Sequence, residues 1–295
     1  MAFKAIVVAI AGFFLGACST VDVLNATAES KNIEISRDLA YGDGDRRTLD
    51  VYRPRDAERA PICVFYYGGG WESGAKESYV FVAAALAARG IVTVVPDYRV
   101  HPEVGFPDFL DDAARAARWA KNNASRFGAD PDRIVLAGHS AGAHIAAMLT
   151  LDSQWLNAVG LDPRRDLAGL VGIAGPYDFL PLESKTLKII FGPPEQLART
   201  QPINFVEGGE PPTLLITGGF DFSVDPRNST RLAAKLENAG GKVTSLEYAG
   251  VGHALVIGAV ARPLRFLAPT LHDTSTFITG LPAVSDRLAA QSDFR

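Results

Sequence analysis

A serine stands between glycines, where an apolar run turns into an expected helix. The string Gly138-His139-Ser140-Ala141-Gly142 fits the pattern G-x-S-x-G. Small residues on both sides of the serine let the backbone bend sharply and expose the hydroxyl. The Ala141 N–H, at the start of the helix, would then face negative charge that develops on a substrate oxygen. The pattern therefore predicts that Ser140 is a nucleophile that attacks a carbonyl carbon.

A second set of backbone donors is expected at residues 67–71, which read Tyr-Gly-Gly-Gly-Trp. Glycines let the backbone approach a ligand closely and turn its N–H groups toward it. The N–H groups of Gly69 and Gly70 are therefore predicted to form an oxyanion hole together with that of Ala141. Gly68 is the weaker candidate, and a tight turn is the alternative interpretation of the run.

A nucleophilic serine needs a base, and the chain has five histidines. His253 follows the expected strand 243–248 through a short glycine loop, and sites of α/β proteins lie at the carboxyl ends of strands. We therefore predict that His253 is the base. The other four are weaker candidates. His139 lies beside the serine and His144 lies inside the following helix, whereas His101 and His272 lie in segments with no strand before them.

The acid that orients the base should lie between the serine and the histidine in the sequence, directly after a strand. Asp221 is the first carboxylate after the expected strand 213–217 and is the predicted acid. Asp225 is the rival, and is predicted instead to cap the helix that follows. Asp97 and Asp178 follow other expected strands and are weaker choices.

Alternating strands and helices must position these residues. Strands are expected where apolar or β-branched residues run together, at residues 61–67, 91–95, 133–137, 169–174, 213–217 and 243–248. Helices are expected between them, at residues 79–89, 108–126, 141–150 and 229–238. This alternation predicts an α/β fold with a mostly parallel central sheet and helices on both faces. The proline-rich segment 176–212 interrupts the alternation and is predicted to be a lid over the site.

Composition and charge exclude several classes of protein. A chain of 295 residues that is 47% hydrophobic can bury a large core, which excludes disorder, collagen and coiled coil. The net charge is −4 and no block is rich in Lys or Arg, so no nucleic-acid partner is expected. The two cysteines, Cys18 and Cys63, lack the spacing of metal ligands, so no metal site is expected. Cys63 lies in an expected core strand and is predicted to be a buried free thiol.

The amino terminus has the marks of a secretory signal. An early lysine is followed by an apolar run over residues 5–15 that is too short to span a bilayer. The string Leu-Gly-Ala-Cys at 15–18 resembles the lipobox of bacterial lipoproteins, in which the cysteine becomes the lipid-bearing first residue. This resemblance implies that residues 1–17 are removed and that Cys18 anchors an exported protein to a bacterial membrane, with Ser19 favouring the outer membrane. A plain signal peptide is the alternative, and residues 18–40 are predicted to be a tether.

Several short sequence motifs, taken together with their order along the chain, resemble those of a known family. They are Gly68-Gly69-Gly70-Trp71 with Gly74 and Lys76, Pro96-Asp97-Tyr98-Arg99, Phe106-Pro107-Asp108, the run 127–134, and the serine string extended to His144. From about residue 49 to 253 the chain resembles α/β-hydrolase fold esterases, of the branch that includes hormone-sensitive-lipase-like carboxylesterases, kynurenine formamidases and isoprenylcysteine methylesterases. The resemblance implies this fold over residues 41–295, and a carboxylesterase-type serine hydrolase that uses Ser140, Asp221 and His253 without a cofactor.

The resemblance leaves the substrate open. Most relatives have a histidine before the glycines, whereas this chain has Tyr67, as the isoprenylcysteine methylesterases do. A small-molecule ester, cleaved through an acyl-enzyme intermediate, is the expected substrate. Hydrolysis of a formamide or other amide by the same triad is one alternative, and a catalytically silent binding module on the same fold is another.

Overall fold

A single sheet forms the centre of the molecule in the computed structural model, which describes residues 20–292. The predicted signal peptide and Cys18 lie outside these residues. Within them the sheet has eight strands, in the order β1-β2-β4-β3-β5-β6-β7-β8. The strands are β1 (Ile33–Ala40), β2 (Thr48–Pro54), β3 (Ala60–Tyr66), β4 (Val92–Pro96), β5 (Ala129–His139), β6 (Gly169–Ile173), β7 (Thr213–Gly218) and β8 (Val243–Tyr248). The sheet is antiparallel from β1 to β4 and parallel from there on, which confirms the prediction of a mostly parallel sheet.

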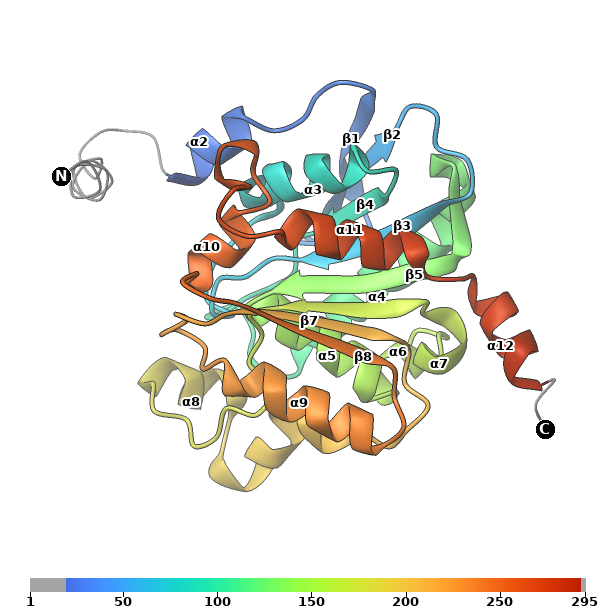
Figure 1. The fold of residues 1–295 in the computed structure, drawn as a ribbon. Helices are drawn as coiled ribbons and strands as arrows, with labels where there is room; N and C mark the ends of the chain where they lie inside the picture. Colours follow the sequence, from blue (N-terminus) through green and yellow to red (C-terminus); the bar gives the residue numbers. More distant parts are fainter. Residues whose placement is uncertain (1–19, 293–295) are drawn as a thin grey trace.

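Helices cover both faces of the sheet (Figure 1). On one face α3 packs on β2 and β4, and α11 packs on β3 and β7; α4, α5 and α9 cover the other face. The α-helices are α2 (Thr20–Ala26), α3 (Val80–Ala87), α4 (Asp108–Asn123), α5 (Ala141–Leu151), α6 (Gln154–Asn157), α7 (Pro163–Asp166), α8 (Lys185–Phe191), α9 (Arg227–Asn238), α10 (His253–Gly258), α11 (Thr270–Gly280) and α12 (Val284–Ser292). The 3₁₀ helices are η1 (Lys76–Tyr79), η2 (Ala124–Phe127), η3 (Pro194–Thr200), η4 (Pro202–Phe205) and η5 (Arg262–Leu264).

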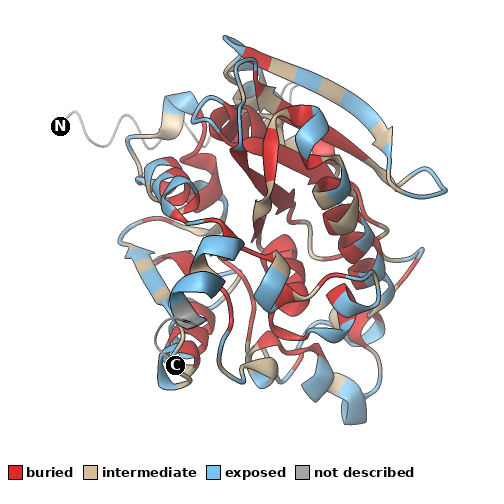
Figure 2. Cartoon of the chain, turned by 90° about the vertical axis from the view of Figure 1, so that its right-hand side faces the viewer, coloured by how far each residue is buried: buried red, intermediate tan, exposed pale blue. Residues whose placement is uncertain are grey.

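Four of the inner strands are buried along their whole length. Every residue of β3, β4, β6 and β7 is buried, because helices cover both faces of a parallel sheet. Figure 2 shows these strands in red, and one edge strand banded in tan and pale blue. Cys63 lies in β3 as the predicted buried free thiol, and burial raises its pKa.

The first elements differ from the predicted tether over residues 18–40. Residues 20–26 form α2, and residues 33–40 form β1, which is hydrogen-bonded to β2. As an edge strand β1 is mostly exposed or half-buried, so its sequence is polar and lacks the apolar run of a central strand. Arg37 of β1 donates a 3.0 Å hydrogen bond to the buried carboxylate of Asp50 in β2. The tether prediction is therefore wrong for α2 and β1.

The topology brings the predicted site residues to one edge of the sheet. The carboxyl ends of β3, β5, β7 and β8 meet there, and the glycine run, Ser140, Asp221 and His253 follow these four strands in turn. Every described element lies within residues 20–292, so a chain that begins at Ser19 keeps this whole fold. None of the described helices is long and apolar enough to cross a membrane.

Candidate active site

Ser140 occupies a sharp turn between β5 and α5. Its φ of 56° and ψ of −123° are values that a non-glycine residue keeps only where its surroundings enforce them. The flanking glycines permit this turn. A Cβ on Gly138 would lie 2.3 Å from the backbone of Gly142, and a Cβ on Gly142 would lie 2.0 Å from the carbonyl oxygen of Tyr66. The turn therefore requires both glycines.

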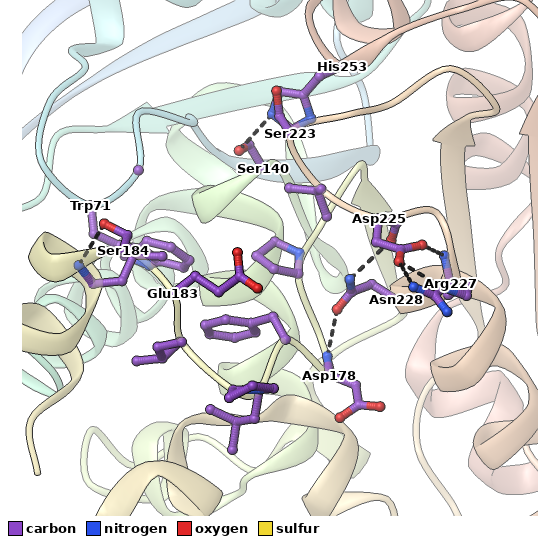
Figure 3. A pocket seen from close by; sticks show the side chains of 18 of the residues that line it. Trp71, Ser140, Asp178, Glu183, Ser184, Ser223, Asp225, Arg227, Asn228 and His253 are labelled. Atoms are coloured by element: carbon purple, nitrogen blue, oxygen red, sulfur yellow. Dashed lines mark hydrogen bonds and ion pairs between the residues drawn. The ribbon is translucent and has the colours of Figure 1, made fainter. Parts of the chain in front are cut away.

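Hydrogen bonds join the three residues of the predicted triad. Ser140 Oγ lies 2.9 Å from His253 Nε2, and His253 Nδ1 lies 2.7 Å from Asp221 Oδ2. Figure 3 shows the first of these contacts at one end of a pocket. Burial alone would raise the pKa of Asp221, but hydrogen bonds from His253 and from the N–H groups of Val224 and Ser223 outweigh it. The pKa of Asp221 is therefore lowered, and the carboxylate is charged at neutral pH.

The rival acids are engaged elsewhere. The Asp225 carboxylate pairs with the Arg227 side chain and accepts a 2.9 Å hydrogen bond from the Arg227 N–H, so it caps the start of α9. Asp97 accepts a hydrogen bond from a tyrosine beneath the glycine run, and Asp178 accepts one from an arginine of α9. Among the described residues, Asp221 is the acid that contacts His253.

The glycine run lies beside the nucleophile. Gly69 has a φ of +144°, and a Cβ there would lie 2.1 Å from the carbonyl oxygen four residues later, so only glycine fits. Nowhere in residues 20–292 does a group accept a hydrogen bond from the N–H of Gly69, Gly70 or Ala141. The Gly68 N–H, in contrast, donates to Tyr79 Oη at 3.1 Å. The three predicted oxyanion donors thus remain available, and the weaker candidate is occupied.

A series of hydrogen bonds connects this glycine run to the histidine loop. Tyr79 Oη, which accepts from Gly68, lies 3.0 Å from His139 Nδ1. His139 Nε2 lies 3.2 Å from the carbonyl oxygen of His253, and the two imidazole rings are 4.8 Å apart between centroids. Neither Tyr79 nor His139 belongs to the predicted site, because His253 is the predicted base and nothing in the spacing marks Tyr79.

The proton positions in this series follow from its chemistry. A carbonyl oxygen can only accept, so His139 Nε2 carries a proton and donates to His253. Burial, aided by the nearby His253, lowers the pKa of His139 to about 3, so the ring is neutral at neutral pH. His139 Nδ1 then accepts from the hydroxyl of Tyr79, whose pKa burial raises to about 12. The series holds the backbone of the base and the backbone of the oxyanion loop in one arrangement.

Tyr79→Phe is expected to lower kcat about tenfold with little change in KM, because the loss of one hydroxyl frees both the Gly68 N–H and His139 Nδ1. The phenylalanine ring keeps the packing, and the matched control is Tyr66→Phe. Tyr66 is also buried, but its hydroxyl donates to the Ala113 carbonyl oxygen in α4. Steady-state kinetics on an ester substrate measures both variants. Equal kcat values for the two variants would show that the series does not position the site.

The side chain of His144 packs within the fold rather than facing the nucleophile. Its Nε2 donates a 2.8 Å hydrogen bond to the Thr200 carbonyl oxygen, and burial lowers its pKa to about 4. Its ring lies edge-on to those of Trp71, Phe179 and Phe191. These aromatic rings therefore enclose the His144 imidazole in a largely buried cluster.

Tyr67, the residue that departs from the family pattern, lies beneath the glycine run. Its hydroxyl donates to Asp97 at 2.9 Å and accepts from Arg46 at 2.9 Å, and its ring stacks on Tyr98 with centroids 4.6 Å apart. Arg46 also donates to the carbonyl oxygen of Gly74, at the far end of the same loop. Tyr67 therefore supports the loop from behind and does not line the pocket.

The triad opens into a cavity of about 880 Å³. Ser140 and His253 lie at one end of it, Trp71 lies beside Ser184, and the first part of the predicted lid forms its wall (Figure 3). Lid residues from Pro176 to Leu187 contribute apolar side chains to that wall. The later part of the segment, in η3 and η4, lies outside the lining, so the segment forms a wall of the pocket along only part of its length.

The side chains that line the cavity carry a net negative charge. Two of its carboxylates are paired, Asp178 with Arg231 and Asp225 with Arg227. Glu72 and Glu183 also line it, and neither has a cationic partner among the described residues. Across residues 20–292, no group of three or more His, Cys, Asp or Glu side chains is placed to hold a metal ion.

The chain is similar in sequence to a known protein family and to named esterases. The model of the BD-FAE family matches residues 49–236. The chain is 30% identical over 263 residues to Esterase LipC of Mycobacterium tuberculosis, and 30% identical over 241 residues to the isoprenylcysteine alpha-carbonyl methylesterase ICME of Arabidopsis thaliana. These alignments cover 82% and 75% of this chain, and the chain spans 64% and 56% of the length of the two relatives.

Solved structures share the architecture. The hyperthermophilic esterase of the archaeon Pyrobaculum calidifontis superposes with a TM-score of 0.71 at 25% identity, over 88% of this chain and 90% of that one. A truncated carbohydrate esterase from gut microbiota superposes with a TM-score of 0.73 at 22% identity, over 85% and 98% of the two chains. These matches confirm the predicted α/β-hydrolase fold, and the curated relatives confirm the predicted resemblance to its esterases.

Proposed function

The chain belongs to the BD-FAE family, and on this premise we propose that it hydrolyses carboxylic esters through an acyl-enzyme intermediate on Ser140. The observation that carries the proposal is the hydrogen-bonded series from Asp221 through His253 to Ser140, beside three available N–H donors. A binding module has no need of this arrangement. The relatives' names, esterase and methylesterase, support the same class of reaction.

The proposed reaction uses the geometry in two halves. His253 Nε2 takes the proton of Ser140 Oγ as the oxygen attacks the ester carbonyl carbon, and the N–H groups of Gly69, Gly70 and Ala141 stabilise the oxyanion. The Asp221 carboxylate holds the His253 tautomer and stabilises the imidazolium. His253 then protonates the departing alcohol. Water, activated by the same histidine, releases the carboxylic acid in the second half.

The charge of the cavity favours a substrate without a negative charge. An anionic group would approach Glu72 and Glu183, while the arginines of the cavity are already paired. Apolar side chains of Phe179, Leu182 and Leu187 line the same space and suit a neutral acyl or alcohol group. N-formylkynurenine, the formamide alternative, is a zwitterion with no net charge, so the charge of the cavity does not separate it from a neutral ester and only turnover can.

Turnover by the chain Ser19–Arg295 tests the proposal. The substrates are p-nitrophenyl esters from acetate to decanoate and N-formylkynurenine. A p-nitrophenyl monoester of a dicarboxylic acid, which carries a negative charge, is compared with the neutral ester of similar chain length. We expect turnover of the neutral esters, and a chain-length optimum that reports the size of the cavity. Faster turnover of N-formylkynurenine than of every ester would assign the formamidase reaction instead. A folded protein that turns over none of them would support the binding-module alternative.

We further propose that the protein is exported and anchored to a bacterial membrane, on the outer membrane or its periplasmic side, through acyl chains on Cys18. The support is the string Leu-Gly-Ala-Cys after a short apolar run. Cells that express the full chain with a labelled fatty acid should yield labelled protein, and Cys18→Ala should yield none. Cys63→Ala is the matched control and should keep the label. Label retained in Cys18→Ala would contradict the anchor.

A further inference from the structure

Exposed apolar side chains gather on the side of the molecule where the active site opens. The described chain exposes nine large apolar side chains. Two of them, Ile35 in β1 and Leu288 in α12, lie elsewhere. The other seven form the group that we call the mouth face: Val23, Leu180, Ile189, Phe220, Phe222, Leu255 and Phe266.

Five residues of the mouth face come from segments that also contribute residues to the lining of the cavity. Leu180 and Phe222 line it, and Phe222 is 92% exposed. Phe220 precedes the catalytic aspartate in the same loop, with its ring 6.4 Å from that of Phe222. Ile189, in α8, and Leu255, in the helix that begins at His253, complete this group. Each of the four segments that carry these exposed apolar side chains thus also contributes a residue to the lining of the cavity.

The remaining two residues extend the mouth face toward the amino terminus. Val23 lies in α2, and Phe266 lies just after η5. The end of α2 and the start of η5 share a hollow, and Glu29 forms an ion pair with Arg265 beside it. Figure 1 shows α2, α10 and α8 along one side of the molecule, with the chain from η5 to α11 between α2 and α10.

Unpaired cationic side chains near the mouth face, and the short distance from Cys18 to α2, indicate what covers this face. The unpaired carboxylates of this side, Glu72 and Glu183, line the cavity itself. Lys185 and Lys188 lie outside the lining, in α8, and Arg262 lies in η5; none of the three forms an ion pair within residues 20–292. Cations beside exposed apolar side chains fit an anionic phospholipid surface. Cys18 precedes Thr20 by two residues, so an acyl chain on it would be attached within about 7 Å of the start of α2.

We propose that the mouth face lies on the surface of a phospholipid bilayer, and that the active site takes its ester from that surface. The apolar side chains enter the boundary between headgroups and acyl chains, and the lysines and the arginine contact lipid phosphates. A lipid anchor at Cys18 holds α2 against the same surface and orients the cavity toward it. The source of the ester and the anchor at Cys18 rest on the proposed function, whereas the contact of the mouth face with lipid requires neither catalysis nor the anchor.

Vesicle binding by Ser19–Arg295, which carries no acyl chain, tests the surface itself. The test variant is Val23→Ser/Ile189→Ser/Phe266→Ser, whose side chains are 52%, 67% and 81% exposed and do not line the cavity. The matched control is Ile35→Ser/Leu288→Ser, from outside the mouth face. Cosedimentation with vesicles of phosphatidylethanolamine and phosphatidylglycerol measures the partition coefficient, and phosphatidylcholine vesicles report the part that depends on lipid charge.

We expect the test variant to lose about tenfold or more in partition coefficient, since three apolar side chains no longer enter the lipid. The control should stay within about twofold, because surface substitutions away from a site have small effects. Both should turn over soluble p-nitrophenyl butyrate like the wild type, whereas turnover of a long-chain ester held in vesicles should fall in the test variant alone.

Three outcomes would overturn the proposal. The first is a wild-type chain that binds neither kind of vesicle, and the second is a test variant that binds like the control. The third is a wild-type dimer that the test variant converts to a monomer in light scattering, which would make the mouth face an interface between copies. Ser140→Ala should bind vesicles like the wild type, so failure of the esterase proposal is distinguishable from failure of this one.

Discussion

Replacing Ser140 with alanine is expected to lower kcat for p-nitrophenyl esters by about 10⁵-fold or more, because the oxygen that forms the acyl-enzyme is lost. The variant should fold normally, since Ser140 Oγ bonds only His253 among the described residues and alanine keeps the same Cβ. Residual turnover would come from the oxyanion donors and from substrate binding. Steady-state kinetics on the purified variant measures the loss, and circular dichroism checks the fold.

Ser223→Ala is the matched control for this experiment. Ser223 lines the same cavity, and its contact with Asp221 is made by its backbone N–H, which alanine retains. We expect its kcat to stay within about threefold of the wild type. A Ser140→Ala enzyme that keeps turnover within tenfold of this control would place the nucleophile on another residue.

Asp221→Asn is expected to lower kcat by about 10⁴-fold, because a neutral amide neither holds the required tautomer of His253 nor stabilises the imidazolium. The 2.7 Å contact between His253 Nδ1 and Asp221 Oδ2 is the geometry on which this rests. Asp225→Asn should leave kcat within about twofold, because the Asp225 carboxylate pairs with Arg227 at the surface. Parallel kinetics on the two variants decides which aspartate is the acid.

For Asp221→Asn, the free energy of unfolding measured against pH shows how far the substitution affects folding as well as catalysis. The folded pKa of Asp221 is below its ordinary value, so its carboxylate contributes stability above the unfolded pKa, and that contribution is lost as the pH falls through the lower, folded pKa. Asp221→Asn should therefore unfold somewhat more easily than the wild type at neutral pH, with the gap closing in acid. A large kcat loss in Asp225→Asn, with Asp221→Asn near the wild type, would reverse the assignment.

Most of the sheet could be predicted because its central strands are covered on both faces. Burial on both sides requires uninterrupted apolar runs, and β3, β4, β6 and β7 show them plainly in the sequence. Since those strands are parallel, the loops that follow them share one edge of the sheet. The spacing of Ser140, Asp221 and His253 after three strands was therefore enough to predict that they meet.

The antiparallel edge and the supporting residues could not be predicted in the same way. The sequence of β1 is polar because the strand is an edge, and β2 carries the buried Asp50, whose partners Arg37 and Lys76 are distant in the sequence. Tyr79 reaches His139 only because η1 folds back against the end of β5. Contacts between such distant residues leave no local pattern, so Tyr79 and the partners of Tyr67 became visible only in the structure.

The backbone path of residues 176–212 could not be predicted for a different reason. Its prolines exclude a regular strand or long helix, but they do not specify where each short turn lies. In the structure its path depends on tertiary hydrogen bonds, such as that from the Phe179 N–H to the Gln201 side chain and that from His144 to the Thr200 carbonyl oxygen. The wall of the cavity therefore depends on contacts that local sequence cannot reveal.

Reaction with a fluorophosphonate, followed by mass spectrometry of the intact chain and its peptides, tests the central claim most directly. An activated serine oxygen forms a bond to phosphorus and fluoride leaves, so the chain gains the mass of one phosphonyl group. We predict one adduct per chain of Ser19–Arg295, on the peptide that contains Ser140, and none on Ser140→Ala. An adduct on another residue, or no adduct on the folded wild-type chain, would contradict the assignment of Ser140 as the nucleophile.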